Sequence, residues 1–177
     1  MKNLKYITSL FFVLITLVSC KKEDAFTFRT VTDDFSTTSN FSVLDISSEM
    51  TQINNSTILD ISSNQDILDN QSLVIDANIN SLTYQITNFS GNTETKLSNP
   101  SIIIGGVRIE IDDINLEEAS NNNTIFEVYN GFLLNNSSEV FRNTTETVVL
   151  VTGAINNSPV SFDITVSINL SVTIDNL

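Results

Sequence analysis

The densest group of acidic side chains lies in the segment RIEIDDIN, which contains Glu110, Asp112 and Asp113. On an extended strand Glu110 and Asp112, two residues apart, lie on the same face, and Asp113 follows in the adjoining turn. Carboxylate oxygens are the ligands that Ca²⁺ prefers, so these three residues are the candidate metal ligands. Ile109 and Ile111 occupy the opposite face, which is the pattern of any half-buried strand. We therefore favour a solvent-facing strand over a Ca²⁺ site, and the spacing does not match an EF-hand loop.

The same carboxylates raise the question of glycosidase chemistry, which needs two acids roughly 5–10 Å apart across a cleft. The chain has no histidine, which removes the Ser-His-Asp and Cys-His nucleophile systems, and no tryptophan to stack against a sugar ring. Tyr84 and Tyr129 could line a ligand groove, although a tyrosine on an alternating strand more often packs into the core. The sequence therefore favours a protein that is not an enzyme and uses no cofactor.

The single cysteine, Cys20, ends an apolar segment at the start of the chain. Lys2 and Lys5 give a short positive region, and residues 7–18 are apolar apart from three hydroxyl side chains. That length is typical of a secretory signal peptide and falls short of the about 20 apolar residues of a membrane-spanning helix. The segment closes with LVSC, which resembles the lipobox of bacterial lipoproteins.

The lipobox resemblance implies that the Cys20 thiol is linked to diacylglycerol and that residues 1–19 are removed as a signal peptide. Two or three acyl chains then anchor the protein stably in a membrane, whereas one alone binds weakly. The tether that follows contains Lys22, Glu23 and Asp24, and it is similar to the surface-export signal of Bacteroidota lipoproteins. This similarity implies an outer-membrane lipoprotein that faces outside; the alternative is one that faces the periplasm.

The charge of the chain limits its partners. Beyond residue 19 the chain carries six basic and 21 acidic residues, a net charge of about −15. Such a surface repels nucleic acid and anionic lipid headgroups, so the expected contact with a membrane is through the lipid anchor alone. The 158 residues that remain after cleavage make about one domain, and we expect residues 20–24 to form the tether and residues 25–177 a single β domain.

The clearest structural signal is the C-terminal segment VSFDITVSINLSVTID. Eight apolar residues alternate there with short polar ones: Val160, Phe162, Ile164, Val166, Ile168, Leu170, Val172 and Ile174. This period of two predicts one long strand with a buried face and a wet face, which bends or crosses between sheets. Residues 146–155 are also β-rich, and the turn at 156–159 predicts that the two segments pair as an antiparallel hairpin.

Other β signals are shorter. They occur at residues 25–31, 41–46, 57–61, 72–89, 102–104, 107–111 and 124–129. A change of phase near Asn80 predicts a bulge or a change of sheet, and Gly105-Gly106 predicts a tight hairpin or a kinked strand. Short helices are predicted at residues 64–70, with Ser63 as N-cap, and at 138–143, with Ser137 as N-cap.

The segment LDISS occurs twice, at residues 44–48 and 59–63, and we interpret the copies as similarly patterned strands because a solenoid needs at least three repeats. Seven to ten strands and few helices predict an all-β fold, an antiparallel β-sandwich of immunoglobulin- or fibronectin-like architecture. The alternative is a curved sheet or barrel with a cavity. The expected role is non-enzymatic: binding an unidentified protein or carbohydrate, adhesion or a structural role. The alternative is a carrier of an apolar ligand.

Overall fold

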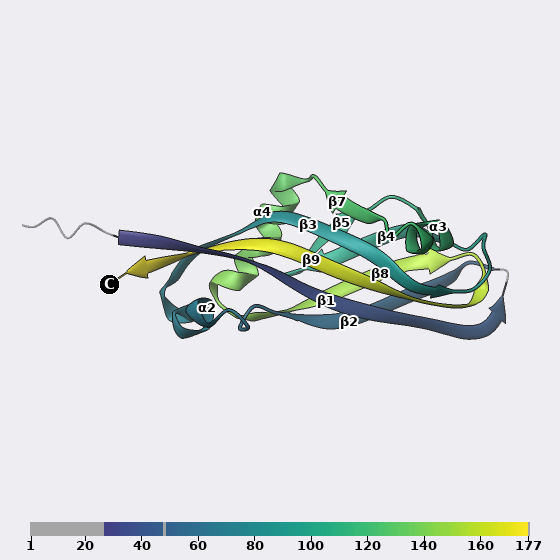
Figure 1. Ribbon diagram of the computed structural model, residues 1–177, viewed down its shortest axis with the longest axis horizontal. Helices are drawn as coiled ribbons and strands as arrows, with labels where there is room; N and C mark the ends of the chain where they lie inside the picture. The colour runs from purple at the N-terminus through teal and green to yellow at the C-terminus, as the bar shows by residue number, and fades with distance from the viewer. Residues whose placement is uncertain (1–26, 48, 177) are drawn as a thin grey trace, which may run out of the picture.

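The computed structural model describes residues 27–47 and 49–176, so Cys20, Lys22, Glu23 and Asp24 lie outside the described residues. The described chain forms two antiparallel sheets packed face to face (Figure 1). The first sheet has the order β1 (Thr27–Ser47), β9 (Ser158–Asn176), β3 (Val74–Ser90), β7 (Ile125–Val128). The second has the order β2 (Thr51–Asp60), β8 (Glu146–Ile155), β4 (Lys96–Ile104), β5 (Val107–Glu110), and β6 (Ile114–Asn115) also pairs with β4.

The strand order defines a jelly roll. Successive long strands alternate between sheets, from β1 in the first sheet to β2 in the second, then back to β3 and over again to β4. Apart from the two-residue β6, the eight strands form two layers of four in this order, which is the double Greek key of that fold. The prediction of an all-β antiparallel sandwich is therefore confirmed, and its topology is a jelly roll rather than the immunoglobulin order. The sheets do not close into a barrel.

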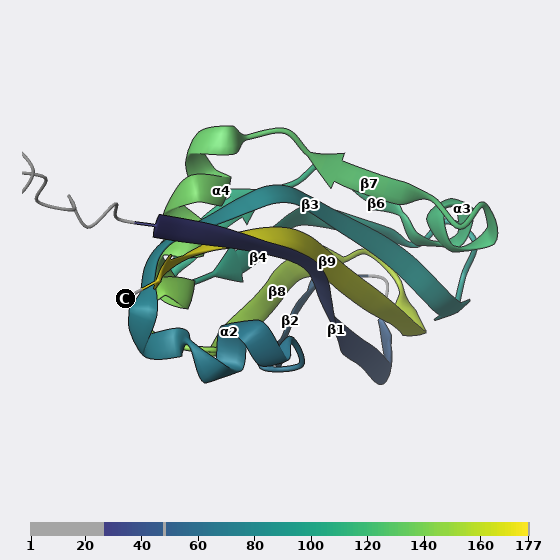
Figure 2. The same cartoon turned by 60° about the vertical axis from the view of Figure 1, so that its left-hand side comes forward.

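Strand β9 builds the centre of the first sheet, between β1 and β3. All eight of its alternating apolar side chains are at most 3% exposed, and they belong to one core that both sheets share. Phe162 stacks on Phe41 of β1 with ring centroids 5.0 Å apart. The strand curves along its length but stays within one sheet (Figure 2).

The predicted hairpin between residues 146–155 and the C-terminal segment is wrong. Strand β8 pairs with β2 and β4, whereas β9 pairs with β1 and β3, so the chain crosses to the opposite sheet after Ile155. Asn156 fixes this crossing: its side chain accepts a hydrogen bond from the Lys96 amide and donates one to the Glu94 carbonyl. The physical reason is that alternation shows which face of a strand is buried and does not show which strand lies beside it.

Two predicted backbone irregularities are confirmed. In β3, Ile79 pairs with Leu170 and Ser81 pairs with the next residue, Asn169, so Asn80 is the extra residue of a bulge. Gly105 and Gly106, with φ of 58° and 81°, form the tight turn that joins β4 to β5. Positive φ at both central positions is the geometry that favours glycine in such hairpins.

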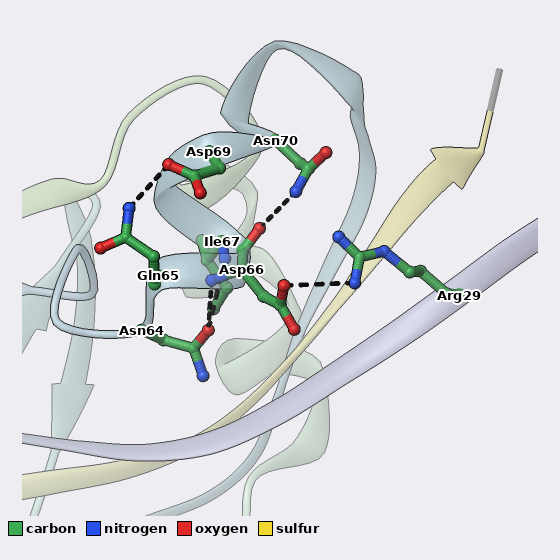
Figure 3. Close-up of polar contacts among 7 residues, drawn as sticks. All are labelled: Arg29, Asn64, Gln65, Asp66, Ile67, Asp69 and Asn70. Atoms are coloured by element: carbon green, nitrogen blue, oxygen red, sulfur yellow. Dashed lines mark hydrogen bonds and ion pairs between the residues drawn. The ribbon is translucent and has the colours of Figure 1, made fainter.

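Three short α-helices lie in the described part of the chain: α2 (Gln65–Asp69), α3 (Leu116–Asn121) and α4 (Gly131–Ser138). Two 3₁₀ turns accompany them, η1 (Gln71–Leu73) and η2 (Glu139–Arg142). Helix α2 is where the sequence predicts it, but its N-cap is Asn64 and not Ser63 (Figure 3). The Asn64 side chain accepts hydrogen bonds from the amides of Asp66 and Ile67, and Arg29 of β1 forms an ion pair with Asp66 at 3.4 Å.

The second predicted helix, residues 138–143, falls on the 3₁₀ turn η2, and the α-helix precedes it. Ser137 is not a cap, because its hydroxyl donates to the Leu133 carbonyl within α4. Asn130 caps α4 instead, and Asn115 caps α3, which the sequence analysis did not predict. No helix within residues 27–47 and 49–176 has the length and apolar composition needed to cross a membrane.

The two LDISS copies lie in opposite environments. Leu44 and Ile46, at the end of β1, are 80% and 88% exposed, whereas Leu59 and Ile61, at the end of β2 and just beyond it, are fully buried. The copies also belong to different sheets. Their difference in burial agrees with the interpretation as similarly patterned strands.

Candidate functional site

The acidic segment lies at one open edge of the sandwich. Glu110 is the last residue of β5, and Asp112 and Asp113 lie in the connection to β6. All three side chains are exposed, whereas Ile109 is 1% exposed and Ile111 packs against the core. The predicted alternation between a wet acidic face and a buried apolar face is therefore present in β5.

The three carboxylates do not converge as a set of Ca²⁺ ligands. In the part of the chain that the structure describes, no three Asp, Glu, His or Cys residues are grouped closely enough to hold a metal ion. Asp113 is used locally, because its Oδ1 accepts a hydrogen bond from the Asn99 amide at 2.8 Å. The placement of these residues is that of a solvent-facing strand end.

Two neighbouring pockets share Glu110, Ile111 and Asp112. The larger, about 390 Å³, is also lined by Asn99, Pro100, Arg108 and Asp113. The smaller, about 200 Å³, lies where β5, the edge strand of the second sheet, faces β7, the edge strand of the first. We call this second space the edge pocket. Its polar lining residues are Tyr84, Glu110, Asp112, Glu127, Tyr129 and Asn130, and its apolar ones are Ile109, Ile111, Val128 and Leu133.

Tyr84 is the most deeply placed polar residue of the edge pocket. It lies on the inner face of β3, is 4% exposed, and stacks on Phe126 of β7 with centroids 4.9 Å apart. Desolvation by burial, with a smaller contribution from the negative charge of Asp112, raises the pKa of Tyr84 to about 12. The phenol therefore stays neutral across the physiological pH range.

Tyr129 lies at the rim of the edge pocket and is 84% exposed. Its hydroxyl donates to Oε2 of Glu127 at 3.0 Å, and this hydrogen bond, together with the carboxylate charge, raises the pKa of Tyr129. Asn130 follows directly, and its side chain accepts from the Leu133 amide at the start of α4. The short segment from β7 to α4 thus places an aromatic ring, a carboxylate and an amide at one rim.

Arg108 does not neutralise the acidic residues beside it. Its guanidinium donates to the Ser101 hydroxyl at 2.7 Å, and Ser101 is in turn hydrogen-bonded to Thr152 at 2.8 Å. Among the described residues no ion pair within 4.0 Å joins Arg108 to a carboxylate. The described lining of the edge pocket contains three carboxylates and no lysine or arginine, and Arg108 lies in the adjoining pocket.

Part of this site is predictable from sequence. Four of the residues that the sequence predicts as site candidates, Glu110, Asp112, Tyr84 and Tyr129, lie around the edge pocket. Glu127 and Asn130 also line the pocket and were not predicted. The available signal was the short segment EVYN, in which Glu127 and Tyr129 alternate on one face of a strand end.

Comparisons with known proteins place the chain in no family. No protein-family description matches it, and no curated protein does. Among solved structures, one titled Desmodium yellow mottle tymovirus is 12% identical, covering 85% of this chain and 84% of that one, with a TM-score of 0.37. A structure of a decameric BFDV capsid protein is 6% identical, and the match covers 81% of this chain and 99% of that one with a TM-score of 0.38. A structure titled Turnip yellow mosaic virus is 12% identical, and the match covers 85% of this chain and 84% of that one with a TM-score of 0.33.

Similarities at these TM-scores carry no argument about this chain. Its own strand order defines a jelly-roll β-sandwich protein with an acidic, aromatic pocket at one edge. Because jelly rolls serve many unrelated functions, this fold does not by itself indicate a function.

Proposed function

We propose that the protein is an outer-membrane lipoprotein, anchored through Cys20 and displayed on the outer face of the membrane, with a non-enzymatic binding role. The observation that carries the proposal is the lipobox LVSC, followed at once by the charged tether with Lys22, Glu23 and Asp24. The jelly-roll body begins with β1 at Thr27. Six residues, 21–26, lie between Cys20 and Thr27, and the seven Cα-to-Cα steps from Cys20 to Thr27 reach about 25 Å when fully extended.

The short tether supports a defined orientation of the body. The start of β1 and the end of β9 lie at the same end of the sandwich, beside α2 (Figure 1). A lipid on Cys20 therefore brings this end close to the membrane surface. The β1–β2 and β8–β9 connections at the opposite end then face away from it.

The edge pocket supports a binding role. It combines the hydroxyl of a tyrosine whose ring is buried, an aromatic ring at the rim and carboxylates beside apolar side chains, which is the mixture of apolar and convergent polar groups typical of ligand sites. The chain has no histidine, and Tyr84 with a pKa of about 12 is a poor proton donor or acceptor near neutrality. For the alternative role as an apolar carrier we find no support, because the side chains of β9 pack into the shared core.

The anchor is tested by growing cells with an alkyne fatty acid and comparing the natural protein with Cys20→Ala. Label is expected on the natural protein and absent from the variant, because the thiol is the site of attachment. Ser36→Ala, a substitution on the outer face of β1, serves as the control and should keep its label. Label on Cys20→Ala, or an uncut leader on the natural protein, contradicts the proposal.

The outward orientation is tested by adding protease to intact cells. The natural protein should be digested, and a variant with Lys22, Glu23 and Asp24 all replaced by alanine should be protected, because the tether would no longer direct export. Both proteins should become sensitive once the outer membrane is permeabilised. Protection of the natural protein in intact cells would assign it to the periplasmic face.

A further inference from the structure

The carboxylates of the edge pocket lack partners. Glu110 and Asp112 make neither a hydrogen bond nor an ion pair within the part of the chain that the structure describes. Glu127 uses one oxygen, Oε2, to accept from Tyr129. Three negative charges therefore line a space of about 200 Å³ without a cationic side chain in its described lining.

The Tyr84 hydroxyl provides a second, independent observation. The ring of Tyr84 is buried, the residue being 4% exposed, and it lines the edge pocket. Its hydroxyl is not among the fully enclosed polar atoms, and no hydrogen bond joins it to another described residue, so it is open to the pocket without a protein partner. The neutral phenol oxygen is thus available as an acceptor at the inner end of the same space that the carboxylates surround.

From this arrangement we infer that the edge pocket binds an alkylammonium group, presented by a lysine side chain or by a free amine. The ammonium group donates up to three hydrogen bonds, and the Tyr84 oxygen and the carboxylates of Asp112 and Glu110 are acceptors without protein donors. The inference rests on the proposed binding role and names its ligand class.

The rest of the lining suits the methylene stem of such a ligand. Ile109, Ile111, Val128 and Leu133 supply apolar surface beside the carboxylates, as long amphipathic amines require. The exposed ring of Tyr129 at the rim offers an electron-rich face to a cation. The strong negative charge of the whole protein attracts cations toward it at low ionic strength.

Two other ligand classes fit less well. A Ca²⁺ ion needs six to eight oxygen ligands, and the described carboxylates are not grouped for a metal. A neutral sugar would leave the three negative charges uncompensated. The positive charge of an alkylammonium group compensates the carboxylates, and its N–H groups can donate to the Tyr84 oxygen.

Ligand binding to the edge pocket can be followed by the fluorescence of its tyrosines. It has no tryptophan and three tyrosines, of which Tyr6 lies in the predicted leader and the other two line the edge pocket. Tyrosine fluorescence of the processed protein isolated from cells, without residues 1–19, therefore reports on this pocket. The probes are n-butylammonium chloride and a lysine blocked at both backbone ends, with sodium chloride at equal ionic strength, calcium chloride and methyl glucoside as comparisons.

We expect a saturable change with both ammonium probes that weakens as salt is added. Asp112→Asn should weaken binding about threefold to tenfold, because it removes one of the facing charges. Glu146→Gln removes the same charge on β8, outside the pocket lining, and should leave binding unchanged. Tyr84→Phe, read by calorimetry, should weaken binding and retain the fold.

Tighter binding of the blocked lysine than of butylammonium assigns the site to a protein side chain, and the reverse assigns it to a free amine. Three outcomes would overturn the inference. They are equal binding by Asp112→Asn and the natural protein, a response to calcium or methyl glucoside alone, and no response to either ammonium probe. The labelling and protease experiments are read on the same preparation. A labelled, surface-exposed protein without amine binding refutes this inference and leaves the proposed anchoring intact.

Discussion

At the scale of single residues, asparagine determines where the helices of this protein begin. Asn64, Asn115 and Asn130 each accept a hydrogen bond from a backbone amide in the first turn of α2, α3 and α4. For α2 the sequence predicts Ser63 as the cap, and since Ser and Asn both favour N-caps these two neighbours could not be separated from sequence. Ser137 is wrong for another reason: the helix was expected at residues 138–143, whereas α4 ends at Ser138.

Replacing Asn64 by alanine should lower the free energy of unfolding by about 1 kcal/mol, the usual effect of losing an N-cap. The same side chain also donates to Oδ2 of Asp33 at 2.8 Å, so the substitution removes a link between α2 and β1 as well. Urea denaturation measures the change. Ser63→Ala, one residue earlier, is the matched control and should stay within about 0.5 kcal/mol of the natural protein. Equal losses for the two variants would show that Asn64 is not the cap.

The same variant should alter the pH dependence of stability. The hydrogen bond from Asn64, and then that from the Asp34 amide, lowers the pKa of Asp33 in the folded protein. A lowered folded pKa contributes stability above the unfolded pKa, and this contribution is lost as the pH falls through the folded value. The gap in stability between the natural protein and Asn64→Ala should therefore narrow as the pH falls below about 4. A gap that widens in acid contradicts this assignment.

At the scale of elements, the alternation of side chains predicted strand faces and failed to predict strand partners. Strand β9 is buried and exposed at alternate positions as the sequence indicated, and β5 places Glu110 outside and Ile109 inside. The error lies between β8 and β9, which adjoin in sequence and lie in different sheets. Both a hairpin and a crossing connection bury the same alternate residues, so only the contacts of the folded sandwich separate them.

The turn between β4 and β5 provides a test at this scale. Gly105 has φ of +58°, and an added Cβ would lie 3.0 Å from the Ser137 carbonyl oxygen and 3.2 Å from Val140 Cγ1. Gly106 has φ of +81°, and an added Cβ there would meet nothing within 4 Å. Alanine at either position should cost about 1–2 kcal/mol of backbone strain. Gly105→Ala should cost more, because α4 and η2 must also move.

The difference in unfolding free energy between Gly105→Ala and Gly106→Ala gives the contribution of the contact between this turn and α4 with η2. Thermal or urea unfolding measures it. A Gly106→Ala protein that is as unstable as Gly105→Ala, or less stable, would show that the contact with Ser137 and Val140 is unimportant.

At the scale of the whole molecule, composition and patterning sufficed for the fold class and could not define the site. The abundance of alternating segments predicted the sandwich. The edge pocket instead combines Tyr84 of β3, Glu110 of β5 and Glu127 of β7, which lie far apart in the chain and meet because the jelly roll places β5 and β7 at the same edge. The order of strands within each sheet is a property of the packed core, and no local pattern in the sequence encodes it.

The pairing of β1 with β9 joins the two extremes of the described chain. Thr27 lies opposite Asn176, and the ladder continues to Val43 opposite Val160. During synthesis β1 therefore remains without its neighbour until residues 158–176 have been made, so the first sheet cannot gain its central strand before then. Native pairs this distant in sequence form slowly, and until they form the apolar side of β1 has no adjoining strand to shield it from water or from other chains.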